Sequence, residues 1–286
     1  MGEISPLLMT ITIFLLLLLL GIITGFYSGL IGTGGNIILI PALDILLTYY
    51  HIEGNELVKF VIAHSLFVTM FLGFFVSYKQ YKINNFHYRE VLLIGIPGMF
   101  IAYMVSEIIK TTTWYDKFYF DLVFFMMLML LAIRLLLIKS KEDKSVVLST
   151  SKPNNISFLG LGALTGSVTS LSGVGGGVVI IPFLTDILKT PIKKASSISI
   201  GVITLLASSV SFSYLSVGDG HQITKILPLQ MGYISISLVL PILGGIFLTS
   251  SFGVKTAQKT SPQKLRIIFG VVVTLLCIKT AFNLFL

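Results

Sequence analysis

Two short glycine-rich runs are the residues in this chain whose type and spacing point most directly to chemistry. The first reads GTGGN at residues 32–36, and the second reads GVGGG at residues 173–177. Glycines leave backbone N–H groups uncovered, and a helix that begins after such a run adds the positive end of its dipole. Two such turns facing each other would hold an anion. The residues that carry this prediction are Gly32, Gly34, Gly35, Asn36, Gly173, Gly175, Gly176 and Gly177.

Polar side chains in two other segments would add hydrogen-bond donors to this site. Ser65 and Ser199 occupy matching positions in two stretches that align at an offset of 134, and Ser197 lies in the same polar run as Ser199. His64 would donate to an anion or take up a proton near neutral pH. Its alternative role is structural, as a neutral imidazole bonded to a neighbouring helix, and the sequence leaves both roles open.

The acidic residues favour an anion over a cation as the substrate. No Asp or Glu falls in the middle of a predicted span, because Asp44, Glu107, Asp121 and Asp186 all lie near span ends. Cation pumps and carboxylate proton relays place such groups inside the membrane. We therefore expect a small anionic substrate.

No enzyme, cofactor or metal centre is predicted. The chain has four His and one Cys, which are too few and too dispersed for a metal ligand set. No G-x-S-x-G elbow occurs, and the first glycine run lacks the spacing and the βαβ context of a dinucleotide site. We expect no catalytic activity, no cofactor and no metal.

The composition places these residues in a lipid bilayer. Hydrophobic residues make up 55% of the chain and charged residues 11%, with a mean hydropathy of +0.95, whereas a soluble domain carries about 25% charged residues. The formal net charge is +8, but the Lys and Arg residues are scattered among short loops. This pattern favours a topological role over nucleic-acid binding.

The chain is a duplication. Residues 21–43 align without a gap to residues 162–184 at an offset of 141, and ten of the 23 positions are identical. Pro97 and Pro241 match further along at an offset of 144. We expect an all-α membrane protein whose repeats are 1–138 and 156–286, joined by the polar linker 139–155. The predicted segments are 7–31, 35–50, 57–78, 90–109 and 117–138, then 156–172, 175–188, 195–216, 226–250 and 265–286.

Charge counting predicts that the two repeats are inverted. A single helix over 156–188 would be about 50 Å long, which is too long for a bilayer of about 30 Å, so the chain must break or turn back at GVGGG. If it turns back, the linker and most loop cations share the cytoplasmic side, as the positive-inside rule requires. Both termini then face outside, in the cell membrane. The cations placed inside in the second repeat are Lys189, Lys193, Lys194, Lys255, Lys259, Lys264 and Arg266.

The signatures GTGGNIILIP at 32–41 and GVGGGVVIIP at 173–182 resemble those of the TauE/SafE family, the sulfite exporter group. The resemblance covers nearly the whole chain and implies a permease for sulfite, thiosulfate or organosulfonates. Two features depart from the family pattern. Asn36 replaces the third glycine of the first signature, and His64-Ser65 and Ile198-Ser199 stand where the family tends to have Thr-Ser.

Three alternatives remain at this stage. In the first, the glycines serve only a tight hairpin and close helix packing, since Gly21, Gly25 and Gly29 repeat at i+4. In the second, the protein is a passive anion channel. In the third, it is a non-transporting membrane anchor or receptor module. Such a module usually carries a soluble appendage or a long loop, and the longest connection in this sequence is the linker 139–155.

Overall fold

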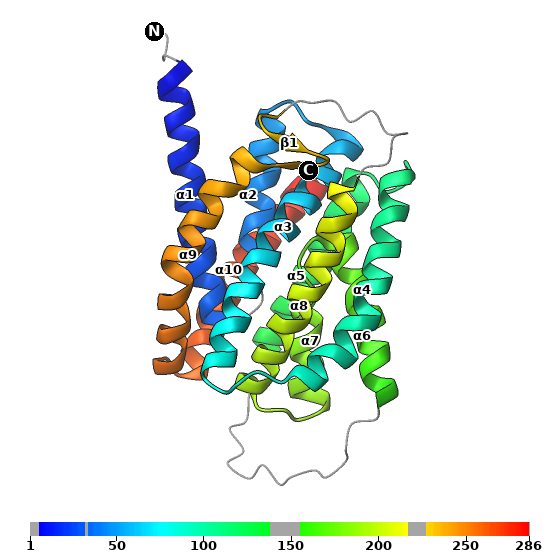
Figure 1. The fold of residues 1–286 in the computed structure, drawn as a ribbon, viewed down its shortest axis with the longest axis vertical. Helices are drawn as coiled ribbons and strands as arrows, with labels where there is room; N and C mark the ends of the chain where they lie inside the picture. The colour runs from blue at the N-terminus through cyan, green and yellow to red at the C-terminus, as the bar shows by residue number, and fades with distance from the viewer. Residues whose placement is uncertain (1–5, 32–33, 138–154, 217–226, 286) are drawn as a thin grey trace.

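A computed structural model describes residues 6–31, 34–137, 155–216 and 227–285 of the chain. Within these ranges the protein is a bundle of helices with one short β-hairpin (Figure 1). The elements are α1 Pro6–Ile31, α2 Asn36–Tyr49, α3 Gly54–Lys82, α4 Tyr88–Thr111, α5 Lys117–Leu137, α6 Asn155–Ser172, α7 Gly177–Pro182, the π-helix η1 Phe183–Ile187, α8 Ile192–Leu215, β1 Gln230–Met231, β2 Ile234–Ser235, α9 Ile236–Lys259 and α10 Pro262–Phe285.

Several of these helices match the dimensions of a membrane, which confirms the predicted all-α membrane class. In the described part of the chain, five are long and apolar enough to cross a bilayer: Ile11–Leu30, Gly54–Lys82, Tyr88–Thr111, Ile192–Leu215 and Ile236–Ala257. Shorter apolar helices cover Asn36–Tyr49, Gly177–Ile187 and Gly270–Phe282.

Each half opens with a helix that stops at a glycine turn and a second helix that runs back. Gly35 immediately precedes α2 with φ 74° and ψ −10°, and Gly176 precedes α7 with φ 73° and ψ −9°. These left-handed dihedrals suit glycine because it has no Cβ. After the first turn, α2 returns toward the end of the bundle at which α1 begins (Figure 1). The chain therefore turns back at the first signature, GTGGN. The same reversal is expected at GVGGG, because a continuous helix over 156–188 would be too long for the bilayer.

The two halves pack against each other through corresponding pairs of helices, in which α6 is the counterpart of α1 and α9 the counterpart of α4. Helix α1 packs on α9 and α6 packs on α4, while α3 contacts α8 and α5 contacts α10 (Figure 1). Glycines make the outer contacts close: a Cβ atom on Gly25 would lie 2.7 Å from Ile246 Cα, and Gly166 lies against the Gly98 backbone. Glycine therefore has a packing role in both halves, in addition to its role in the turns.

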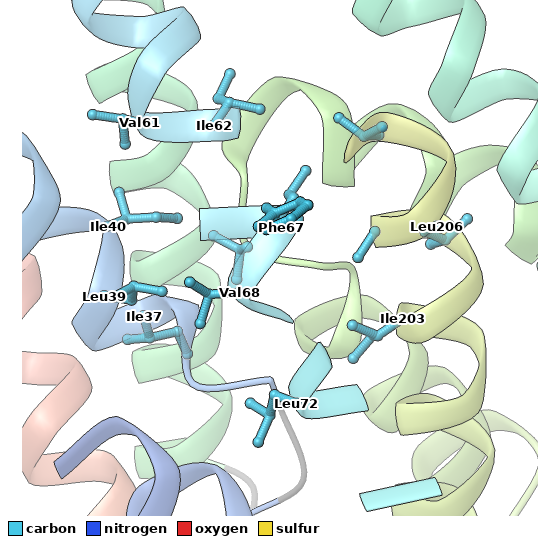
Figure 2. Packing of buried hydrophobic residues seen from close by; sticks show 14 of the residues in the cluster. Ile37, Leu39, Ile40, Val61, Ile62, Phe67, Val68, Leu72, Ile203 and Leu206 are labelled. Carbon is cyan, nitrogen blue, oxygen red and sulfur yellow. The ribbon is translucent and has the colours of Figure 1, made fainter. Parts of the chain in front are cut away.

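The apolar core surrounds the beginning of α2. Ile37 and Leu39 of α2, Val68 of α3 and Ile203 of α8 have no solvent exposure, and Figure 2 shows Ile37, Leu39 and Val68 close together with Ile203 across the core. The first residues after the glycine turn are thus packed against the central helix α3.

The structure differs from the sequence prediction between 226 and 236. The predicted helix 226–250 begins only at Ile236, and the residues before it form the antiparallel pair β1 and β2, in which Gln230 pairs with Ser235. Pro228 lacks a backbone N–H and Gly232 has φ 56°, so neither favours a helix there. Most of the predicted linker, 138–154, lies outside the described residues, and the division into 1–138, 139–155 and 156–286 remains a prediction.

Candidate functional site

The two glycine turns meet through the side chain of Asn36. Its Nδ2 donates a hydrogen bond of 2.6 Å to the carbonyl oxygen of Gly173, across 137 positions of sequence. Asn36 is fully buried, and the glycines of both turns that the structure describes are buried as well. In this conformation the site is closed to solvent.

The two turns also share the same apolar neighbours. A Cβ atom on Gly34 would lie 3.6 Å from Thr69 Cγ2 and 3.7 Å from Ile203 Cγ2. A Cβ atom on Gly175 would lie 3.0 Å from Ile203 Cγ2 and 3.8 Å from Thr69 Cγ2. Thr69 of α3 and Ile203 of α8 therefore lie against both turns, where the two central helices contact each other.

Several backbone N–H groups at each turn lack acceptors among the described residues. The first N–H groups of a helix have no intrahelical partner. Among the described residues, none accepts a hydrogen bond from the N–H groups of 34–37 or of 175–178, and these residues are buried. Two sets of buried donors therefore lie next to each other in the middle of the bundle.

Two buried hydroxyl groups beside the first turn have no hydrogen-bond partner among the described residues. Thr24 and Ser28 lie against Gly35, with Thr24 Cγ2 2.7 Å and Ser28 Cβ 3.3 Å from a Cβ placed there. The hydroxyl of Ser199 on α8, one helical turn before Ile203, is likewise without a partner among these residues. Thr165 is the repeat counterpart of Thr24, yet its hydroxyl donates to the Leu161 carbonyl at 2.7 Å. The two turns therefore differ in the open hydroxyls beside them.

Comparison with known proteins assigns the chain to a family. The family model described as Sulfite exporter TauE/SafE matches residues 17–280. The chain belongs to the TauE/SafE family. This confirms the resemblance carried by the two glycine signatures.

Relatives of this TauE/SafE protein are described as probable membrane transporter proteins. One from Methanocaldococcus jannaschii is 32% identical over 89% of this chain and 90% of its own length. One from Haemophilus influenzae is 28% identical over 96% of this chain and 99% of its own length. YunE from Bacillus subtilis is 26% identical over 72% of this chain and 79% of its own length. No solved structure matches the chain significantly. The protein is a multi-pass membrane transporter.

The structure brings most of the predicted site residues of this TauE/SafE protein together. Ser65 Oγ lies 3.1 Å from the Ile62 carbonyl and 3.5 Å from the Gly173 carbonyl, so the serine lies beside the second turn. Gly32 lies outside the described residues. The predicted residues at or beside the two turns are Gly34, Gly35, Asn36, Ser65, Gly173, Gly175, Gly176 and Gly177.

Two predicted residues have their polar groups engaged elsewhere. His64 Nδ1 lies 2.7 Å from the Phe60 carbonyl, and its Nε2 accepts a 2.9 Å hydrogen bond from the backbone N–H of Ser235. The ring therefore offers no free nitrogen to a substrate in this conformation. Ser197 donates its hydroxyl to the carbonyl of Asn85, in the loop between α3 and α4.

Three residues near the turns were missing from the sequence prediction: Thr24, Ser28 and Thr69. Thr24 carried a signal, since it is one of the identical positions of the repeat. Thr69 lies one helical turn after Ser65, and its hydroxyl is 2.8 Å from the Ser65 carbonyl. A search for hydroxyl groups at i+4 from the predicted serine would have found it.

Charged side chains lie at the far ends of the broken helices rather than at the turns. Lys117 Nζ is 2.9 Å from Asp44 of α2 and 2.7 Å from Asp121, while Arg134 binds Asp186 of η1 through Nε at 2.8 Å. A cleft near the first of these pairs is lined by Ile40, Pro41, Asp44, Phe120, Asp121, Phe124, Lys279 and Thr280. In the part of the chain that the structure describes, no group of three or more His, Cys, Asp or Glu side chains could hold a metal ion.

Proposed function

We propose that this TauE/SafE protein transports a small sulfur-containing oxyanion, such as sulfite, thiosulfate or an organosulfonate, and binds it between the two glycine turns. The observation that supports this most is that two sets of backbone N–H groups, at 34–37 and 175–178, are buried and have no hydrogen-bond partner among the described residues. The family description names sulfite as an exported substrate.

Unpaired donors of this kind favour an anionic ligand. A buried polar group left unpaired costs about 1–3 kcal/mol, and within a bilayer no solvent compensates for it unless a cavity is wet. An oxyanion would accept hydrogen bonds from several backbone N–H groups at once, together with the hydroxyls of Thr24, Ser28 and Ser199. Several donors at fixed positions would favour a multi-oxygen anion over chloride.

The described site also explains how such an anion would be released. Asn36, Ser65 and Thr69 are neutral, and the ion pairs of Lys117 and Arg134 lie at the far ends of α2 and η1. Dipoles and hydrogen bonds without a full counter-charge hold an anion moderately, which suits a site that must empty in every cycle. His64 and Ser197 are not needed for this binding, because their polar groups already bond to the backbone.

We further propose that the two halves, 1–138 and 156–286, are inverted repeats in the cell membrane, with linker 139–155 in the cytoplasm and both termini outside. The directions of the helices support this arrangement, because α1 begins at one end of the bundle and its repeat counterpart α6 begins at the other (Figure 1). The pairs α1 with α9 and α6 with α4 fit the same symmetry. Transporters of this type bind substrate where broken helices meet and open alternately to each side.

The unpaired hydroxyls provide the test of the site. Thr24→Val and Ser199→Ala remove donors that bond to nothing within the described residues, so each variant should keep its thermal stability. Each should weaken sulfite or thiosulfate binding about tenfold, the effect of one lost hydrogen bond to a charged group of about 1.5 kcal/mol. Binding is measured on purified protein, and uptake in proteoliposomes is measured as a function of anion concentration.

Thr165→Val is the matched control, since Thr165 occupies the equivalent position in the second half but donates to its own helix. Its anion affinity should stay within about twofold of the parent. Unchanged affinity in both Thr24→Val and Ser199→Ala would contradict the proposed site. Uptake that rises without saturation would contradict a transporter and favour a passive channel.

A further inference from the structure

We infer that Asn36 is a latch between the two halves: its side chain holds the two glycine turns together and must release before substrate passes. The inference rests on the proposed transport function and deepens it by naming the positioning residue that controls access to the site. It assigns Asn36 a role different from that of an anion donor.

The latch consists of two hydrogen bonds on one buried amide. Nδ2 donates to the Gly173 carbonyl at 2.6 Å, and Oδ1 accepts a hydrogen bond from the hydroxyl of Thr69. The first bond joins the two halves, and the second fixes the amide to the central helix α3. Asn36 and Thr69 have no solvent exposure, so water does not compete for these bonds.

The latch exists in one half alone. Position 177, the repeat counterpart of Asn36, is glycine, and a glycine has no side chain with which to reach the first turn. A single bridging amide therefore joins a pair of turns whose backbone conformations are otherwise alike. Replacing Asn36 by glycine would give the first turn the same glycines as the second without disturbing the left-handed residues before it.

The contrast between Asn36 and its neighbours separates a latch from a substrate ligand. The hydroxyls of Thr24, Ser28 and Ser199 and the N–H groups of 34–37 and 175–178 have no partners among the described residues. The Asn36 amide, by contrast, has both its oxygen and its nitrogen bonded to protein. If the turns move apart, the 2.6 Å bond from Asn36 to the Gly173 carbonyl must break. The Ser65 hydroxyl of α3 reaches the same carbonyl only at 3.5 Å.

Access to the closed site is the property to measure. Ser199 and Ile203 lie one turn apart on the same face of α8, and Ile203 touches both glycine turns, so Ser199→Cys reports on the site. The full chain, with Cys277→Ser, is purified in detergent and labelled with an uncharged methanethiosulfonate reagent that carries no sulfonate group. Adding Asn36→Gly or Asn36→Ala should accelerate labelling about tenfold, because loss of both bonds shifts the closed state by about 1.4 kcal/mol.

Thr69 gives an independent variant. Thr69→Val removes the hydroxyl that bonds Asn36 Oδ1 and should accelerate labelling about threefold, whereas Thr69→Ser keeps the hydroxyl and should label at the parental rate. Asn55→Gly is the matched control, since Asn55 Nδ2 also donates to a distant carbonyl, that of Thr113 at 3.0 Å, but in an exposed contact at the start of α3. Its labelling rate should be parental.

Parental labelling rates in folded Asn36→Gly and Asn36→Ala would overturn the latch. So would an equal acceleration in Asn55→Gly, because it would indicate general loosening. The measurement needs no transported anion, so its outcome is independent of whether sulfite, thiosulfate or sulfonate binding is found. Failure of anion binding with the expected labelling pattern would reject the proposed substrate and keep the latch.

Discussion

At the scale of single residues, burial and hydrogen bonding separate side chains that support the fold from those left open for a ligand. His64 belongs to the first kind, because its two nitrogens contact Phe60 and Ser235. His64→Ala would leave the Ser235 N–H unpaired and open a cavity, at a cost of about 2–3 kcal/mol. We expect a lower midpoint of thermal unfolding and an anion affinity within about threefold of the parent.

His51 provides the control for this experiment, since it is exposed. Its φ of 57° is tolerated by asparagine, so His51→Asn should leave the unfolding midpoint unchanged. If His64→Ala kept the parental midpoint while anion binding fell, His64 would belong to the binding site.

At the scale of elements, helix α5 links the far ends of both broken helices. Lys117 at its start contacts Asp44 of α2, and Arg134 near its end contacts Asp186 of η1. These two positions are about 25 Å apart along the helix axis, at 1.5 Å per residue. Helix α5 therefore contacts both broken helices through ion pairs near its two ends.

A double-mutant cycle tests the second of these contacts. Arg134→Asp and Asp186→Arg should each destabilise the protein by about 1 kcal/mol, a modest effect because the pair is partly exposed and screened. The double variant should recover at least half of that loss, because the charges are again opposite. Unfolding in detergent is the measurement. Purely additive losses would show that the ion pair does not couple α5 to η1.

The sequence predicted helices far better than it predicted contacts. Long apolar runs bounded by charges or glycines lie within a few residues of the observed helices, as for 117–138 and α5 Lys117–Leu137. The hairpin at 230–235 was missed because its apolar residues extend the run of α9. The Asn36–Gly173 bond joins residues 137 positions apart, and no local pattern encodes such a contact.

The same limit applies to the polar side chains of the site. Ser197 and Ser199 are two positions apart on α8, about 200° around the helix, so they face different surroundings. One donates to the Asn85 carbonyl, and the other has no partner among the described residues. Sequence spacing identified a polar stretch, but the neighbouring helices decide which of its members is already hydrogen-bonded.

At the scale of the whole molecule, the central question is whether the halves have opposite orientations in the membrane. The helices that begin and end the described chain support a shared side for the termini, since α1 begins and α10 ends at the same end of the bundle, while α5 ends and α6 begins at the other (Figure 1). On the positive-inside rule, we propose that the end that carries Lys79, Lys82 and Lys189 faces the cytoplasm.

Cysteine labelling decides this orientation directly. In a Cys277→Ser background, Lys189→Cys and Ala257→Cys should react with a membrane-impermeant thiol reagent from the cytoplasmic side alone, and Glu53→Cys from the outside alone. Lys189 and Glu53 are exposed, so slow labelling from the expected side would not be due to burial. Labelling of position 189 or 257 from outside would exclude the inverted arrangement, because the second half would then cross the membrane in the same sense as the first. Labelling as expected would leave the two glycine turns entering the bilayer from opposite sides, which is the geometry that alternating access to one shared site requires.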